Sequence, residues 1–157
     1  MTIEPQRSPL STAAQMPAAS PALWNPNAAA NWSLLFSPAF GSYLHMRNWH
    51  ALQEPAKAAT ARRWFIASLF MLGVYAVLAF GFPNSKPVAA TTRGLSLAYL
   101  LAWYFAAARG QAKYVKARFG AAYERRKWGT PLAFGALGLV GFLVAAFIVG
   151  IVVALVH

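Results

Sequence analysis

The sequence has no cysteine and only three acidic residues in its 157 positions. Without thiols, the chain cannot form disulfides, thiolate metal sites or cysteine nucleophiles. The acids Glu4, Glu54 and Glu124 offer no pair of carboxylates for acid–base catalysis. His45 and His50 are five residues apart, whereas two ligands on one helix face are four apart. We therefore expect no enzyme, no metal site and no cofactor.

Charged residues are scarce as well, at 11% of the chain, whereas soluble domains carry about 25%. Hydrophobic residues make up 59%, which argues against a water-soluble fold. A net charge of +11 would suggest nucleic acid in a soluble protein. Here the basic residues flank apolar runs, which favours attraction to anionic headgroups and the positive-inside bias of membrane proteins. We predict a lipid bilayer, and no nucleic acid, as the partner.

Residues 1–23 are rich in proline, alanine and serine and show no hydrophobic periodicity. This composition predicts a disordered tail. A signal peptide is not expected, because Glu4 and the prolines interrupt any apolar core.

Residues 24–52 include the least repetitive stretch of the chain, WNPNAAANWSLLFSPAFGSYLHMRNW at 24–49. Asn25-Pro26 and Ser37-Pro38 both fit an N-cap followed by proline at the first helical position. The pattern predicts two short helices, at 26–36 and 38–52, that are bent at Ser37-Pro38.

This broken segment is long enough to span a bilayer but contains many polar residues, which raise the cost of insertion. Helical spacing gives one apolar face, made of Phe36, Phe40, Tyr43, Leu44 and Ala51. Off that face are Ser42, His45, Asn48 and Trp49. Three alternatives stay open, of which we favour the first two: an interfacial amphipathic helix, a re-entrant segment or a fourth transmembrane span.

Residues 53–157 contain three apolar runs, at about 64–82, 88–108 and 131–156. At ~1.5 Å per residue each covers most or all of a ~30 Å hydrocarbon core. We therefore predict an all-α, polytopic helical membrane protein with three transmembrane helices plus the broken segment. The stretch 109–128 is predicted to be a basic cytoplasmic loop, in which an apolar stripe at helical spacing includes Val115 and Phe119.

Basic residues gather between the broken segment and the first apolar run, and again between the second and third apolar runs. This distribution predicts that both loops are cytoplasmic and that the C-terminus is outside. Tryptophans suit the headgroup region. The residues predicted to contact headgroups are Trp24, Trp32, Trp49, Trp64, Trp128, Arg62, Arg63, Lys113, Lys116, Arg118, Arg125, Arg126 and Lys127.

The last apolar run contains small residues spaced four apart, a pattern that lets helix backbones approach closely. We expect one such ridge to pack against a neighbouring helix, most simply within the same chain. The candidate positions are Gly141, Ala145, Ala146, Gly150 and Ala154.

The stretch from residue 24 to about 63 resembles a segment of small, uncharacterised bacterial membrane proteins, some of which carry a GYF-like domain ahead of it. We expect no such domain here, because only 23 residues precede the segment. The resemblance implies a bacterial inner-membrane protein and brings no activity. We therefore expect a non-enzymatic accessory protein that contacts lipid and another membrane protein or itself. The alternatives are an immunity-type protein against a membrane-acting toxin and a homo-oligomeric channel.

Overall fold

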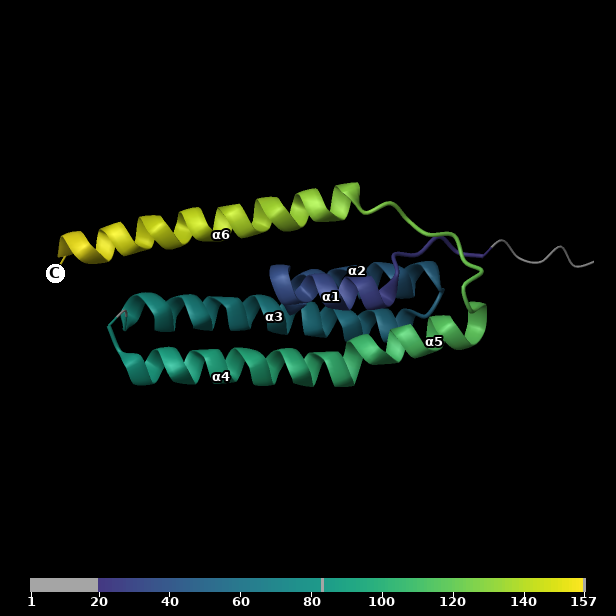
Figure 1. Cartoon of the computed structure of the whole chain (residues 1–157), viewed down its shortest axis with the longest axis horizontal. Coiled ribbons are helices and arrows are strands. Elements are labelled where there is room, and N and C mark those ends of the chain that lie inside the picture. The colour runs from purple at the N-terminus through teal and green to yellow at the C-terminus, as the bar shows by residue number, and fades with distance from the viewer. Residues whose placement is uncertain (1–19, 83, 157) are drawn as a thin grey trace, which may run out of the picture.

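The computed structural model describes residues 20–82 and 84–156, except for the side chains at 153, 154 and 156. Of the predicted tail, residues 1–23, positions 1–19 lie outside the described residues. Every named element in the described part of the chain is a helix (Figure 1). In chain order these are α1 (Pro26–Phe36), α2 (Pro38–Ala51), α3 (Pro55–Gly81), α4 (Lys86–Trp103), the π-helix η1 (Tyr104–Ala108), α5 (Arg109–Phe119) and α6 (Gly129–Val156).

Two of these helices, α3 and α6, are long and apolar enough to cross a membrane, with mean hydropathies of 2.0 and 2.6. Only 6% of the apolar window of α3 and none of that of α6 is buried within the chain. A core helix of a soluble protein would instead be buried all round. The third predicted span, 88–108, is helical throughout as α4 and η1. Among the described helices, however, only α3 and α6 are long and apolar enough to cross a membrane.

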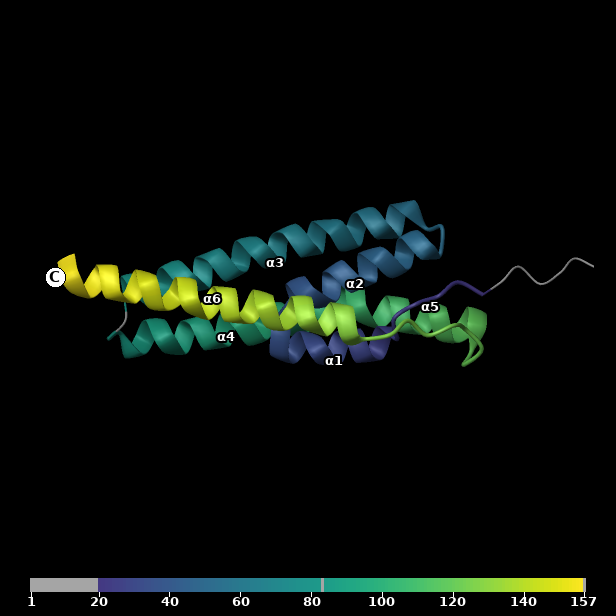
Figure 2. The ribbon, with the colours of Figure 1, turned by 90° about the horizontal axis from the view of Figure 1, so that it is seen from above.

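The broken segment at 24–52 forms a helical hairpin, α1 followed by α2, whose two ends lie at the same end of the molecule (Figures 1 and 2). The side chain of Asn48 joins those ends. Its Oδ1 accepts a hydrogen bond from the Trp24 amide at 3.0 Å, and its Nδ2 donates to the Trp24 carbonyl at 2.8 Å. The segment therefore doubles back along the long axis of the molecule.

The hairpin turns at Ser37, whose φ of 87° lies in the left-handed region. The bounds of α1 and α2 match the prediction to within one residue. Asn25 caps α1 as predicted, because its side chain accepts from the amides of Asn27 and Ala28. Ser37 stands at the N-cap position of α2 with Pro38 after it, as predicted, but its side chain makes no capping hydrogen bond.

The buried face of α2 carries polar side chains. Ser42, His45 and Asn48, which fall off the predicted apolar face, are all at most 2% exposed. Of the predicted apolar face, Leu44 is buried at 1% exposed, whereas Tyr43 is 41% exposed. The expected orientation of α2 therefore holds for Leu44 and is wrong for the three polar residues.

The helices α4, η1 and α5 follow one another without a loop and return along α3 (Figure 1). Where α3 and α4 meet, the hydroxyls of Ser68 and Tyr99 lie 3.0 Å apart. The segment predicted to be a loop, 109–128, is helical up to Phe119. Val115 from the predicted apolar stripe is buried and holds this helix against the rest of the molecule.

Candidate functional site

Helix α6 lies along one side of the molecule, with the hairpin and α3 between it and α4 (Figures 1 and 2). It contacts α1 and α3. Its closest approach is at Gly135, where a Cβ would lie 3.1 Å from the rings of both Phe36 and Phe40. The first turns of α6 therefore rest on the tip of the hairpin.

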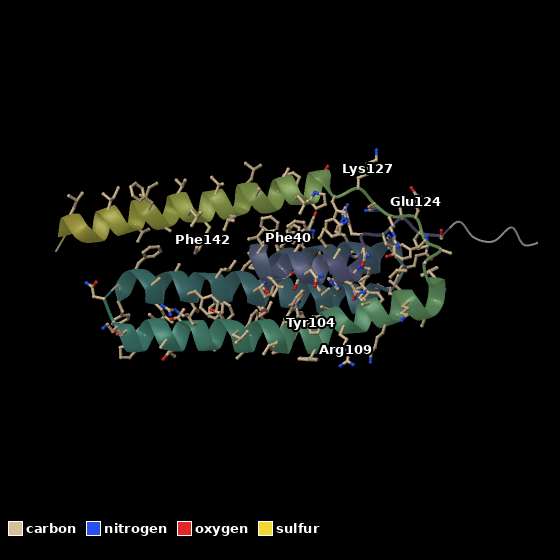
Figure 3. All side chains as sticks on the ribbon, viewed as in Figure 1. Phe40, Tyr104, Arg109, Glu124, Lys127 and Phe142 are labelled. Atoms are coloured by element: carbon tan, nitrogen blue, oxygen red, sulfur yellow. The ribbon has the colours of Figure 1, made fainter. Side chains whose placement is uncertain are left out.

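Next to this contact lies a groove of about 890 Å³, bounded by the hairpin, α3 and α6, which we call the α6 groove. Its walls are mainly aromatic and aliphatic; they include Phe40, Phe65, Leu69, Leu72, Leu139 and Phe142. Phe40 and Phe142 both lie in the space between α6 and the layer below it (Figure 3). The volume falls within the ~300–1,000 Å³ range of ligand sites, which are also lined mainly by apolar side chains.

One cationic side chain lines the α6 groove, and a second stacks on a lining residue. Arg47 lines it and is exposed. Trp24 also lines it, and the Arg126 guanidinium stands 4.7 Å from the centroid of the Trp24 ring. The indole N–H of Trp24 donates to the Lys127 carbonyl at 3.1 Å. The groove thus has long apolar walls and a positively charged mouth.

Backbone hydrogen bonds fix this mouth in place. The Leu23 amide donates to the Glu124 carbonyl and the Arg126 amide donates to the Leu23 carbonyl, both at 2.9 Å. Leu23 is fully buried, although the sequence placed it at the end of a disordered tail. The difference arises because these two bonds and the burial of its side chain hold the residue. Trp24 is therefore held between the hairpin and the segment that leads into α6.

A buried amide pair positions the hairpin against α5. Asn48 Nδ2 donates to Gln111 Oε1 at 3.2 Å, and Gln111 Nε2 donates to the His45 carbonyl at 2.9 Å. Gln111 is fully buried. Sequence reasoning did not select Gln111, because a single glutamine among basic residues carries no pattern that reveals burial.

The predicted headgroup residues have different surroundings in the structure. Trp49 is only 7% exposed, in a cluster with Ala58 and Ala61, so its ring belongs to the packed interior rather than to a headgroup surface. Trp103, which the sequence did not single out, is the largest fully buried side chain. Half-buried are Trp24, Trp32, Trp64, Trp128 and Arg126; exposed are Arg62, Arg63, Lys113, Lys116, Arg118, Arg125 and Lys127.

The basic side chains come from the start of α3, from α5 and from the segment before α6, which all lie at the end of the molecule opposite the C-terminus (Figure 1). Lys127 and Arg109 lie on opposite sides of that end (Figure 3). The fold thus gathers positive charge from distant parts of the sequence at one end.

The small residues predicted to pack between helices differ in their exposure within the described part of the chain. Gly141, Ala145 and Gly150 are exposed, and Ala146 is half-buried. The side chain of Ala154 lies outside the described part. In the described part of α6, the glycine in close helix contact is Gly135, which was not among the predicted positions. Packing of the predicted ridge on a separate helix stays a prediction.

Comparison with known proteins gives no relative: no family model, no curated protein and no solved structure matches the chain. Apolar walls with a cationic mouth are suited to an amphiphile that has hydrocarbon chains and an anionic head.

Proposed function

We propose that this chain is a non-enzymatic accessory protein of the bacterial inner membrane that holds an anionic phospholipid in the α6 groove. The single observation that supports it is the combination of apolar walls with Arg47 in the lining and Arg126 stacked on the lining residue Trp24. An acyl chain would lie along Phe40, Phe65 and Phe142, and the phosphate would lie beside the guanidinium groups. Arginine suits this role because its planar donors match phosphate oxygens.

The position of the α6 groove also supports a lipid occupant. Two of its walls are α3 and α6, the helices that can cross a membrane. Acyl chains of a surrounding bilayer would reach such a groove without passing through water.

In the proposed topology, α3, the continuous α4–η1–α5 helix and α6 make three passes, and the C-terminus is outside. The gathering of basic residues at the opposite end of the molecule supports a cytoplasmic location for that end. The hairpin begins and ends there, so the N-terminus would be cytoplasmic as well. The side chains around Arg47 would then face the inner leaflet, where anionic lipids attract basic residues.

Native mass spectrometry of the purified full chain with added phosphatidylglycerol or phosphatidylcholine tests this function. Gly138 lines the groove, and a Cβ there would meet no atom within 4 Å, so Gly138→Trp places a ring in the groove. Gly141→Trp is the matched control, because Gly141 lies one turn along α6 with equally open space and outside the groove.

We expect the protein to bind phosphatidylglycerol in preference to phosphatidylcholine, and Gly138→Trp to lose both lipids while Gly141→Trp keeps them. Arg47→Ala should weaken the preference for phosphatidylglycerol roughly fivefold, since one basic residue contributes ~1 kcal/mol near anionic lipid. Equal lipid binding by Gly138→Trp and the unaltered protein would overturn the proposal.

The immunity-type and channel alternatives have separate tests. The absence of a toxin gene beside this gene would count heavily against an immunity role. Ion flux through liposomes that contain the purified chain would support a channel, and absence of flux would exclude one.

A further inference from the structure

A second cavity, of about 260 Å³, lies on the other side of the hairpin from the α6 groove, between α2, α3 and the η1–α5 region. We call it the Ser42–His45 cavity. Apart from Ser42 and His45, its lining includes Trp49, Lys57, Trp103 and Tyr114. None of these residues lines the α6 groove, so the two spaces are separate.

Two polar side chains of this cavity lack partners. Ser42 and His45 are 1% and 2% exposed, and in the described part of the chain neither the Ser42 Oγ nor either ring nitrogen of His45 has a hydrogen-bond partner. Leaving a buried polar group unpaired costs about 1–3 kcal/mol. The neighbouring buried amides of Asn48 and Gln111 are both paired. Three unpaired polar atoms in the lining of one cavity therefore point to a binding site for a ligand with polar atoms of its own.

The cavity favours a neutral ligand. Burial lowers the pKa of His45 to about 4, and the nearby Pro26 carbonyl acts in the opposite direction. The imidazole is therefore uncharged at neutral pH and offers one donor and one acceptor. The charged residue in the lining, Lys57, already pairs with Glu54 at 3.3 Å. The cavity thus offers hydrogen bonds without an unpaired charge.

The shape of the cavity favours a planar ring. The rings of Trp49, Trp103 and Tyr114 form part of its walls, while Ala61, Ala106, Ala107 and Gly110 leave open space. The π-helix η1 contributes two of these alanines, and such bulges often occur at functional sites. The volume lies just below the ~300–1,000 Å³ of drug-sized ligand sites, so it suits one or two fused rings.

We propose that the Ser42–His45 cavity binds the ring of a neutral, lipid-soluble carbonyl compound of the quinone class. The Ser42 hydroxyl and the N–H of His45 donate hydrogen bonds to ring carbonyl oxygens, and the aromatic walls pack against the ring faces. Such a ligand satisfies the unpaired donors and can reach the cavity from a membrane, where its hydrocarbon part dissolves.

The test uses the purified full chain in detergent with 2-methyl-1,4-naphthoquinone as the probe and two readouts, quenching of tryptophan fluorescence and the shift of the melting temperature. A ligand that binds the folded state raises the melting temperature. The matched compound is 2-methylnaphthalene, which has the same rings and no carbonyl oxygens. The variants are His45→Leu, Ser42→Ala and the control His50→Leu, whose histidine is exposed on the same helix.

We expect saturable quenching and a raised melting temperature with the naphthoquinone only. His45→Leu should bind it about tenfold more weakly, as the loss of a buried hydrogen bond predicts, while His50→Leu binds it unchanged. Without ligand, His45→Leu should melt at or above the temperature of the unaltered protein, because it removes an unpaired polar group. A merely structural histidine would give a lower melting temperature.

Three results would each overturn the proposal: no saturation, equal stabilisation by 2-methylnaphthalene, or equal binding by His45→Leu and His50→Leu. Waters alone in the cavity would give the first result. If His45→Leu does not fold, Ser42→Ala decides, since it removes one oxygen atom and should bind several-fold more weakly. Gly138→Trp should bind the naphthoquinone normally, which separates this cavity from the α6 groove.

Discussion

At the scale of single residues, Gly41 shows how closely the hairpin packs. A Cβ at this position would lie 2.0 Å from the Ser33 Oγ and 2.6 Å from the ring of Trp103. Ser33 cannot easily move, because its hydroxyl donates to the Ala29 carbonyl at 2.9 Å, and Trp103 is fully buried. Gly41 therefore permits α2 to lie against both α1 and the end of α4.

We predict that Gly41→Ala lowers the free energy of unfolding by about 1–3 kcal/mol, the usual effect of overpacking an interior. Gly73→Ala is the control, because a Cβ at Gly73 in α3 would meet no atom within 4 Å. Thermal unfolding of both variants in the same detergent provides the measurement. Equal melting temperatures for the two variants would contradict the close packing described for Gly41.

The burial of Ser42, His45 and Asn48 could not be predicted from the sequence. Two of them, Asn48 through its side chain and His45 through its carbonyl, are bonded to Gln111, which is 63 and 66 residues away in the sequence. Rules of amphipathicity also assume that apolar faces turn inward, as in water. In a helix that borders a membrane the apolar face can instead face lipid. The polar face of such an amphipathic helix then turns toward the interior of the protein.

At the scale of elements, the turn of the hairpin is the strained feature. Ser37 has φ 87° and ψ 160°, a region that is essentially restricted to glycine and costs about 1–3 kcal/mol for other residues. Pro38 favours an extended ψ at the residue before it, which agrees with the observed value. The close packing of α1 on α2 holds Ser37 in this conformation.

Ser37→Gly should therefore raise the free energy of unfolding by about 1 kcal/mol, because glycine adopts this conformation without the steric cost. Ser96→Gly, in the interior of α4, should lower it by a few tenths of a kcal/mol, because glycine is a poor helix former. Thermal unfolding again measures both. A destabilised Ser37→Gly variant would show that the serine side chain itself is needed at the turn.

Helix bounds were predictable where local chemistry sets them. Asn25-Pro26 begins α1 and Pro38 begins α2, because proline at the first helical position needs no amide partner. The apolar runs that form α3 and α6 were predictable for a similar reason, since their composition alone reveals them. The segment that forms α5 was predicted to be a loop because of its many charges, although its apolar stripe at helical spacing includes the buried Val115. The inward position of Gln111 depends on contacts with the hairpin and could not be predicted.

At the scale of the whole molecule, most of the basic residues in the described part lie at one end, whereas Lys86 and Arg93 lie toward the end that holds the C-terminus (Figure 1). Lipid headgroups and the positive-inside bias act on such an asymmetry during insertion. Because the hairpin begins and ends at the same end of the molecule, Trp24 lies at the end where α3 begins (Figure 1).

We predict that reporters fused to Met1 and to His157 report opposite sides of the membrane, with Met1 cytoplasmic and His157 outside. Alkaline phosphatase is active only outside and green fluorescent protein only inside, so the pair gives a signal for either location. Replacing Arg125, Arg126 and Lys127 together by alanine is expected to weaken this orientation, because it removes basic residues next to α6. A cytoplasmic His157 would refute the topology.

The backbone bonds between Leu23 and the segment before α6 have a consequence for the order of folding. Trp24 and its partner Lys127 are 103 residues apart, so ~5–20 s of synthesis at 5–20 residues per second separates them. The start of the hairpin must therefore wait until α3 and α4 have been made before its last bonds can form. Closing the mouth of the α6 groove is thus among the final steps of maturation.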